Sequence, residues 1–567
     1  MGKRKVLLNA LTVAVAVTVV AGCSSNNGNN ANAPEGGNTG NNKTNTEATT
    51  EGNTTTEAPK SELYELGKEP LDLTFYGNYN WYTMPQWGKD AASKWIQENK
   101  KINITAIHSG GNAPQKLQTM IAGNDLPDII WTDRGADFDR LYEAGLLVSL
   151  DEYIEKYPNF KKWADPKMIN MLRSADGKIY GMPNYYTNQP NGNAGYIVNR
   201  KIYKALGEPK LETTDDLYAY LKQVKEKYPD VVPFETGLAK EGNGIDQLFS
   251  AFKEDNFSFT RYWAVPVGDK FESIYKDEGF RESMVYSAKL MREGLMTQDA
   301  MTQTEDQIKE KILSGRVAVY ASVDPMKLAM QADQELSAKD PNDGYFFIMP
   351  IYKQGLDPAK IYPGTYNMLG WNMAAITTSA DNPEAIFAML DWMTGPEGSS
   401  VQMWGPPGPD GYWDGFKEDS ETPNFTARYG DDPKELIDIQ AVSGDMIWVG
   451  NTVFLDSKKS EFEATLPEEK RNWSTNWQYK ITWKTQGDAT QFVNLNPSPD
   501  SPEGIVAQSV KDIWLTARAQ ALFAKSDAEV LAILDKAHDD SVAVGFPQYL
   551  EAITAKWHSN QEKMAGN

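Results

Sequence analysis

The chain has 567 residues, with 78 acidic and 56 basic side chains, so its formal net charge at neutral pH is −22. This charge argues against nucleic acid or an anionic membrane surface as the main ligand. The single cysteine excludes an internal disulfide, and the three scattered histidines lack the spacing of a structural zinc site.

The N-terminus has the pattern of a secretory signal. Basic residues 3–5 precede an apolar stretch, residues 6–21, which ends in small residues. The polar Asn9 interrupts this stretch, so a membrane-spanning helix, which needs about 20 apolar residues, is the weaker alternative. The run Val20-Ala21-Gly22-Cys23 resembles the lipobox of bacterial lipoproteins. That resemblance implies that Cys23 becomes the mature N-terminus and carries acyl chains such as palmitate, which would hold the protein on a membrane.

Residues 24–60 contain no Val, Ile, Leu, Met or aromatic side chain and are rich in Asn, Thr, Gly and Glu. Such a segment cannot bury enough apolar surface to offset the entropy of ordering, so we expect a disordered tether. A flexible coil of this length has a typical end-to-end distance of about 35 Å.

The first folded stretch predicts alternating strands and helices. Residues 71–76 and 102–107 alternate as strands do, a helix is expected within 80–100 and another over 114–122, and residues 129–131 read as a buried strand. This alternation predicts parallel strands joined by helices, with ligands bound beyond the carboxyl ends of the strands.

Later segments carry clear helix signals. Residues 304–307 form a capping box for a helix that Gly315 ends, and a strand is expected over 316–321. Pro383 suits the first turn of another helix, and a further helix is expected from Ser526 towards Ala537.

The motifs of common enzymes are absent from the sequence. It has no nucleophile elbow, no phosphate-binding P-loop and no dinucleotide fingerprint. A glycosidase needs only two carboxylates, so a secreted carbohydrate-active enzyme stays open as an alternative.

Several segments, taken in order and spacing, resemble the family 1 extracellular solute-binding proteins, in the branch of large Gram-positive lipoproteins that serve oligosaccharide importers. The segments are the lipobox ending at Cys23, Leu126-Pro127-Asp128-Ile129-Ile130-Trp131, Gly177-Lys178-Ile179-Tyr180-Gly181-Met182-Pro183, Gly195-Tyr196-Ile197-Val198-Asn199-Arg200, Asp215-Asp216-Leu217, and Gly370-Trp371-Asn372 leading into Asn382-Pro383-Glu384-Ala385.

The resemblance implies an α/β fold of the type II periplasmic-binding-protein class, with two α/β lobes, a hinge and a ligand cleft between the lobes. The expected divisions are a signal peptide at 1–22, a lipidated Cys23 with its tether to residue 66, a first lobe at 67–186 plus about 373–445, and a second lobe at 187–372 plus about 446–567.

The function implied is capture of an oligosaccharide for an ABC importer. The expected protein is a non-enzymatic monomer without a cofactor, lipid-anchored outside the cytoplasmic membrane, with permease subunits as partners. Coupling to a membrane sensor instead of an importer is a further alternative.

One departure from the family pattern concerns calcium. Members of this branch often carry a calcium loop after the helix that here ends near residues 227–230, but Val231-Val232-Pro233-Phe234 follows at once. Calcium needs six to eight oxygen ligands, so we expect no metal there.

Aromatic residues in Asn- and Gly-rich loops provide the candidate sugar site, because pyranose rings stack on aromatic faces and their hydroxyls bind amides and carboxylates. For each tryptophan, burial in the core is the competing interpretation. The candidates are Asn78 and Trp81 after the first strand, Trp131 and Asp133 at the end of the second parallel strand, Tyr185 and Tyr186 in the expected hinge, and Trp263, Trp371 and Trp404.

Overall fold

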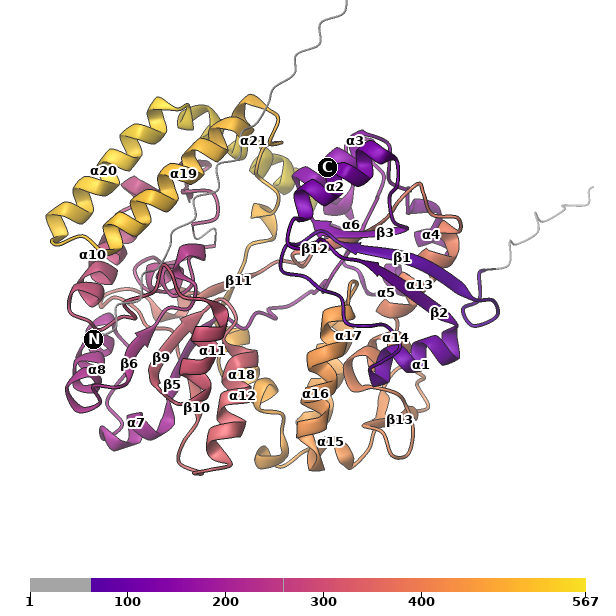
Figure 1. Ribbon diagram of the computed structural model, residues 1–567, viewed down its shortest axis with the longest axis horizontal. Coiled ribbons are helices and arrows are strands. Elements are labelled where there is room, and N and C mark those ends of the chain that lie inside the picture. Colours follow the sequence, from indigo (N-terminus) through magenta and orange to yellow (C-terminus); the bar gives the residue numbers. More distant parts are fainter. Residues whose placement is uncertain (1–62, 258–259, 567) are drawn as a thin grey trace, which may run out of the picture. The chain divides into compact units, whose positions relative to one another are not determined.

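The computed structural model describes residues 63–257 and 260–566, and the chain from Glu62 onward forms one compact unit. The expected signal peptide, Cys23 and nearly all of the expected tether lie outside the described residues. Within the compact unit two sheets each have a core of their own, and we call these parts the first and the second lobe (Figure 1).

The first lobe is built on a five-stranded sheet in the order β2-β1-β3-β12-β4. Its strands are β1 (Leu71–Gly77), β2 (Ile102–Ile107), β3 (Ile129–Asp133), β4 (Met182–Pro183) and β12 (Asn372–Ile376). Strand β1 pairs in parallel with β2 and β3, whereas β12 runs antiparallel to β3 and β4. The predicted parallel strands are therefore confirmed, and β1 and β3 end at the same edge of the sheet.

Helices pack against this sheet and share one core with it, which includes Phe75, Ile130, Ala374 and Phe387. They are α1 (Ala91–Lys100), α2 (Ala113–Gly123), α3 (Ala136–Glu143), α4 (Asp151–Lys156), α5 (Asn159–Trp163), α6 (Pro166–Leu172), α13 (Pro383–Thr394), α14 (Pro396–Trp404), α15 (Arg428–Asp431), α16 (Pro433–Ser443) and α17 (Thr452–Glu463), together with the hairpin of β13 (Trp413–Phe416) and β14 (Pro423–Phe425).

Helix α1 occupies only the second half of the range expected for it. Pro85 lacks the N–H that a helix interior requires, and Gly88 adopts φ +76°, so residues 80–90 do not continue a helix. Asp90 then caps α1 by accepting hydrogen bonds from the backbone N–H groups of Ala92 and Ser93, at 3.0 and 3.1 Å.

The second lobe contains a four-stranded sheet in the order β10-β5-β9-β6. Its strands are β5 (Gly195–Asn199), β6 (Val232–Glu235), β9 (Val317–Ser322) and β10 (Tyr345–Ile348). Its helices are α7 (Arg200–Ala205), α8 (Thr214–Lys227), α9 (Ile245–Ser250), α10 (Glu278–Arg292), α11 (Glu305–Leu313), α12 (Met326–Ser337), α18 (Trp473–Lys480), α19 (Pro502–Leu522), α20 (Asp527–Ala543) and α21 (Phe546–Ala565).

Two small strand pairs complete the second lobe: β7 (Ala264–Val267) with β8 (Lys270–Ser273), and β11 (Gly364–Tyr366) with β15 (Gln486–Asp488). The capping box predicted at Thr304 is confirmed, because Thr304 and Gln307 exchange both backbone-to-side-chain hydrogen bonds. The helices expected from Pro383 and Ser526 correspond to α13 and α20.

The chain returns to the second lobe later than expected. Trp448, Val449, Phe454 and Leu455 belong to the core of the first lobe, so the expected division near residue 445 falls inside that lobe. The first lobe extends through α17, and Trp473 on α18 is the next aromatic residue to pack on the second lobe.

At the far end of the chain, α21 contacts α6 of the first lobe, where Lys563 Nζ donates to the Arg173 carbonyl at 3.0 Å (Figure 1).

Candidate binding site between the lobes

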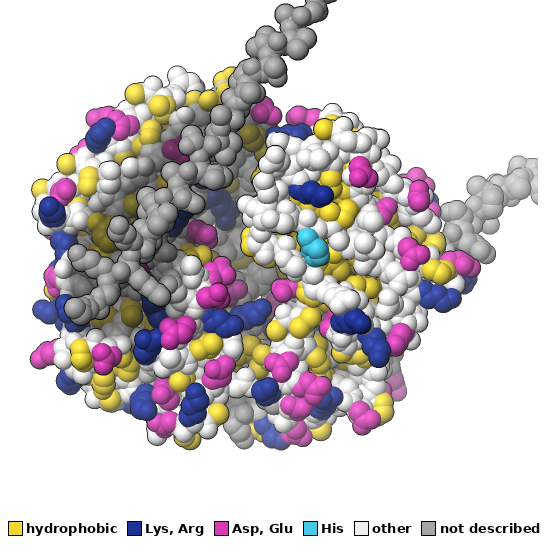
Figure 2. Space-filling model, in the orientation of Figure 1, with side chains coloured by type: hydrophobic (Ala, Val, Ile, Leu, Met, Phe, Trp, Pro, Cys, Tyr) yellow, Lys and Arg dark blue, Asp and Glu magenta, His cyan; other side chains and the backbone are white. Residues whose placement is uncertain are grey.

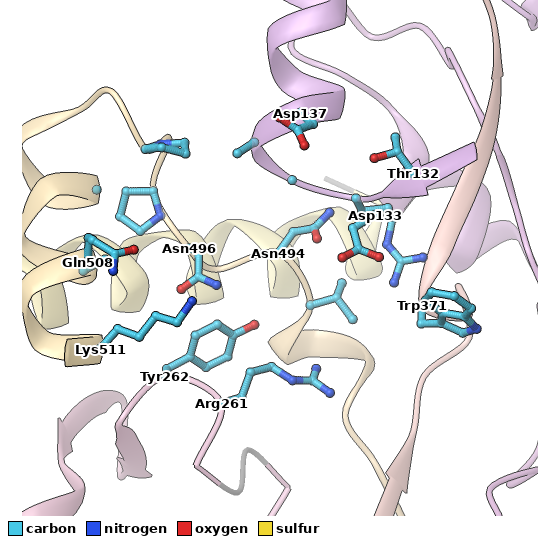
Figure 3. A pocket seen from close by; sticks show the side chains of 18 of the residues that line it. Thr132, Asp133, Asp137, Arg261, Tyr262, Trp371, Asn494, Asn496, Gln508 and Lys511 are labelled. Carbon is cyan, nitrogen blue, oxygen red and sulfur yellow. The ribbon is translucent and has the colours of Figure 1, made fainter. Parts of the chain in front are cut away.

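A pocket of about 970 Å³ lies where segments of both lobes meet. Asn78, Tyr79 and residues 132–137 line it from the first lobe, directly beyond the carboxyl ends of β1 and β3. Residues 261–263 and the first turns of α19 line it from the second lobe (Figure 3). The pocket therefore lies at the strand ends where the sequence predicts a ligand.

Four aromatic side chains, Tyr79, Trp81, Trp131 and Trp371, form a continuous cluster that we call the aromatic wall. The ring centroid of Trp371 lies 5.4 Å from that of Tyr79, 6.1 Å from Trp81 and 5.3 Å from Trp131. Trp371 is 46% exposed and lines the pocket, while Trp81 is 65% exposed beside it. Trp131 is only 5% exposed, so it supports the two exposed indoles from beneath.

The crossing segment that carries Trp371 is held by hydrogen bonds from both sides. Asn184 Oδ1 accepts from the backbone N–H groups of Trp371 and Asn372, at 3.0 and 3.1 Å. Arg134 Nη1 and Nη2 donate to the carbonyls of Leu369 and Gly370, both at 2.5 Å. These bonds fix the backbone at Trp371, so its indole is presented to the pocket without being buried.

Polar side chains beside the wall are already paired with one another. Asn78 Nδ2 donates to Asp137 Oδ2 at 2.9 Å and to Thr132 Oγ1 at 3.1 Å. Asp133 accepts the hydroxyl of Tyr79 at 2.8 Å. The surrounding protein partly desolvates the Asp133 carboxyl and so raises its pKa, an effect that the Tyr79 hydroxyl and the charge of Arg134 only partly oppose.

The second lobe presents a different set of groups. Trp263 adopts a left-handed backbone conformation with φ +51°, packs its ring 5.7 Å from that of Tyr549 and lines the pocket from the second lobe. Arg261 precedes it, and Gln508 and Lys511 extend from α19 (Figure 3). Planar amides, a guanidinium and an ammonium are groups that bind hydroxyl and carboxylate oxygens.

The structure brings four of the nine predicted ligand-binding residues to the pocket wall: Asn78, Asp133, Trp263 and Trp371. Trp131 and Trp81 do not line the pocket themselves but belong to the aromatic wall, in which Trp131 contacts both Trp81 and Trp371. The structure does not bring the remaining three, Tyr185, Tyr186 and Trp404, to this pocket.

These three side chains pack elsewhere in the first lobe. Trp404 is 0% exposed at the end of α14, with its ring 4.8 Å from that of Phe425, and Tyr186 is 1% exposed with its ring 5.7 Å from that of Phe160. The Tyr185 hydroxyl points at the Gly444 carbonyl, 3.4 Å away. In this arrangement the three residues have packing roles, which corrects the expectation that they bind ligand.

Sequence reasoning missed the polar residues that the C-terminal segment contributes to the pocket, which are Asn494, Asn496, Gln508 and Lys511, as well as Arg134 and Arg261. The Asn- and Pro-rich run before the helix cap at Ser501 could have marked residues 494–500 as a binding loop. Among the described residues, no group of three or more His, Cys, Asp or Glu side chains is arranged to hold a metal ion.

Sequence comparison identifies relatives of the chain. Residues 82–399 match the family described as bacterial extracellular solute-binding protein. The polygalacturonan/rhamnogalacturonan-binding protein of Bacillus subtilis is 26% identical over 243 residues, 41% of this chain and 46% of the relative. The melibiose/raffinose/stachyose-binding protein of the same organism is 23% identical over 311 residues, 53% of this chain and 66% of the relative. The alignments thus span less than two thirds of the length of these relatives.

Solved structures share the fold at low identity. The S. pneumoniae ABC-transporter substrate-binding protein FusA, in complex with kestose, superposes with a TM-score of 0.63 at 18% identity, covering 86% of this chain and 99% of FusA. The alginate-binding protein AlgQ2 gives a TM-score of 0.62 at 17% identity, covering 87% and 98%. This likeness confirms the predicted fold class, that of the type II periplasmic binding proteins.

Proposed function

This chain belongs to the bacterial extracellular solute-binding proteins, and on that premise we propose that it captures an oligosaccharide between its lobes and delivers it to the permease of an ABC importer. The observation that carries the proposal is the half-exposed Trp371 at the pocket, backed by the buried Trp131, in a pocket that Trp263 of the other lobe also lines.

The chemistry of the pocket suits a sugar. An exposed indole offers a flat apolar face to the C–H side of a pyranose ring, and the wall behind it keeps that face in place. Asn494, Asn496 and Gln508 supply amides that both donate to and accept from hydroxyl groups. A pocket that combines aromatic rings, amides and charged side chains is typical of a small-molecule binding site.

The names of the relatives support the same ligand class, since the two Bacillus proteins are named for polysaccharide and oligosaccharide ligands. We propose that the protein acts outside the cytoplasmic membrane, held by acyl chains on Cys23, as a monomer that closes around its ligand. In the described part of the chain no helix is long and apolar enough to span a membrane.

The carboxylates Asp133 and Asp137 line the pocket, so a test of binding must also look for catalysis. The full-length protein is screened by thermal shift against neutral and acidic oligosaccharides, and each mixture is then examined for shortened products by mass spectrometry. We expect a rise in melting temperature with at least one oligosaccharide and recovery of that sugar intact. Conversion of the sugar into shortened products would favour a glycoside hydrolase. An unchanged melting temperature with every sugar would contradict the proposal.

A further inference from the structure

The charges inside the pocket differ from those of the chain as a whole. The net charge of the chain is −22, and acidic and basic side chains are interspersed over the face seen in Figure 2. In contrast, the described residues that line the pocket include three cations, Arg134, Arg261 and Lys511, and two carboxylates, Asp133 and Asp137. A local excess of positive charge in so acidic a protein favours a negatively charged ligand.

Both carboxylates already have partners on the first lobe. Asp137 accepts from Asn78 at 2.9 Å and lies 3.2 Å from Arg140 Nη1. Asp133 accepts the Tyr79 hydroxyl at 2.8 Å. Each carboxylate therefore has hydrogen-bond partners within the first lobe and does not depend on a cation from the second lobe.

The cations of the pocket, in contrast, lack carboxylate partners among the described residues. In the described part of the chain none of Arg134, Arg261 and Lys511 forms an ion pair within 4.0 Å of a carboxylate, although the chain has many such pairs elsewhere. The buried Nε of Arg134 also has no hydrogen-bond partner among the described atoms. Burial and, after it, the nearby positive charge of Arg261 lower the pKa of Arg134 to about 10. An anion placed between these two guanidinium groups would relieve their repulsion.

The cations are also placed to meet a bound sugar. Arg261 extends its guanidinium towards the side of the pocket where Asp133 and Trp371 lie, and Lys511 lies on the other side of Tyr262 (Figure 3). A ring stacked on Trp371 would bring its substituents near Arg261, and a neighbouring ring would meet Lys511 and Gln508. Guanidinium and carboxylate form paired, charge-assisted hydrogen bonds, which neutral hydroxyls cannot match.

From this arrangement we infer that the pocket selects an acidic oligosaccharide, in which uronate carboxylates bind Arg261 and Lys511 while a ring stacks on Trp371. The inference rests on the proposed function and narrows its ligand to uronate-containing chains. A neutral oligosaccharide would leave the two exposed cations of the second lobe without a counter-charge inside the pocket.

The test compares sugars that differ only in the carboxylate. Trimers of galacturonate, mannuronate and guluronate, and the carboxyl-reduced form of each trimer, are titrated calorimetrically into the full-length protein at 20 and 300 mM NaCl. We expect at least one uronate trimer to bind ten-fold or more tightly than its reduced form, a gap that one charge-assisted hydrogen bond can supply. Salt should weaken that binding, because it screens charge pairs at the pocket mouth.

Substitutions of single side chains test which cations bind the uronate carboxylate. Arg261→Gln and Lys511→Gln should each weaken uronate binding about ten-fold, and Arg261→Lys should recover part of the loss because it keeps the charge. Lys434→Gln removes the same charge from α16, outside the pocket, and should leave the affinity unchanged.

The outcomes separate the two proposals. If reduced or other neutral oligosaccharides bind as tightly as every uronate trimer, the inference is overturned while the proposed function stands. If neither acidic nor neutral sugars bind, the proposed function fails and the inference falls with it. Uronate binding that survives both Arg261→Gln and Lys511→Gln would also overturn the inference.

Discussion

Trp371 and Trp131 have ring centroids only 5.3 Å apart, yet the first indole is 46% exposed and the second 5%. The difference follows from their positions, since Trp131 belongs to the central strand β3 and Trp371 to a crossing segment just before β12. The flanking Gly370 and Asn372 made the exposure of Trp371 predictable from the sequence.

Replacing Trp371 by Ala should therefore weaken oligosaccharide binding roughly ten-fold, or about 1.4 kcal/mol, with little loss of stability. Trp131→Ala is the matched control, because deleting a buried indole should cost about 3–5 kcal/mol of unfolding free energy. Urea denaturation and calorimetric titration of both variants check this pair. A Trp371→Ala protein with normal affinity would show that the aromatic wall does not carry the sugar.

Asp246 is a second residue that allows a test, because its ionisation affects the stability of the fold. Its carboxylate accepts the Thr260 hydroxyl at 2.9 Å, but its Oδ1 is buried without a partner among the described atoms. Burial raises the pKa of Asp246 to about 6, against the opposing charge of Arg518. Because the folded-state pKa exceeds the unfolded one, folding takes up a proton between these two values, and lower pH favours the folded state.

We therefore expect the wild type to gain about 1 kcal/mol of stability relative to Asp246→Asn as the pH falls from 7.5 to 5. Urea denaturation of both proteins at the two pH values measures this difference. Parallel changes in the two proteins would mean that Asp246 ionises in the folded state as an ordinary surface carboxyl does.

The packing of Trp404 could not be predicted from its neighbours in the sequence. The indole is followed by Gly405, Pro406 and Pro407, a pattern typical of an exposed loop. In the structure α14 ends at Trp404, and the indole packs against Phe425 from the hairpin strand β14, some twenty residues later. Contacts between segments this far apart leave no signal in local composition. Arg261 and Lys511 were missed for the same reason.

Among the elements, the strands and helices with strong periodicity were predictable, while the crossing before β12 depends on close packing of backbone. Gly370 has φ +60°, and a Cβ atom there would lie 1.9 Å from the Asn184 carbonyl oxygen. The same segment accepts the Arg134 guanidinium hydrogen bonds, so displacing it would move Trp371 as well.

Gly370→Ala should accordingly lower the unfolding free energy by more than the roughly 1–2 kcal/mol that a left-handed alanine costs, and should weaken sugar binding. Gly268→Ala is a suitable control, because Gly268 has φ +63° with no atom within 4 Å of the added Cβ. Denaturation of both variants isolates the effect of packing. Equal losses in the two would argue against a tightly packed crossing.

At the scale of the whole molecule, the alternation of strands and helices predicts parallel α/β units and the family resemblance predicts two lobes, but the division expected near residue 445 lies inside the first lobe. The segment around Trp448 looks no different in composition from second-lobe sequence, and only its packing against Phe75, at 4.2 Å between ring centroids, assigns it to the first lobe. Lobe boundaries in a chain that crosses repeatedly depend on such contacts between distant residues.

The proposed anchor makes a separate prediction for the intact protein. Cys23→Ala should shift the protein from the membrane fraction to the soluble one in a lipoprotein-processing bacterium, because the acyl chains would have no attachment point. Sugar affinity should not change, since more than 40 residues separate Cys23 from β1. A variant that stays with the membrane would point to an uncleaved N-terminal helix, and a loss of affinity would show that the N-terminal segment takes part in binding.

Hydrogen–deuterium exchange of the full-length protein, measured with and without a saturating oligosaccharide, reports directly whether a sugar binds between the two lobes. With sugar bound there, we expect slower exchange in residues 78–82, 131–137 and 367–372 of the first lobe and crossing, and in residues 260–263 and 494–511 of the second. Protection on both sides at once is expected because closure buries the same ligand against both lobes. Protection confined to one lobe, or located away from these segments while calorimetry shows bound sugar, would contradict binding between the two lobes.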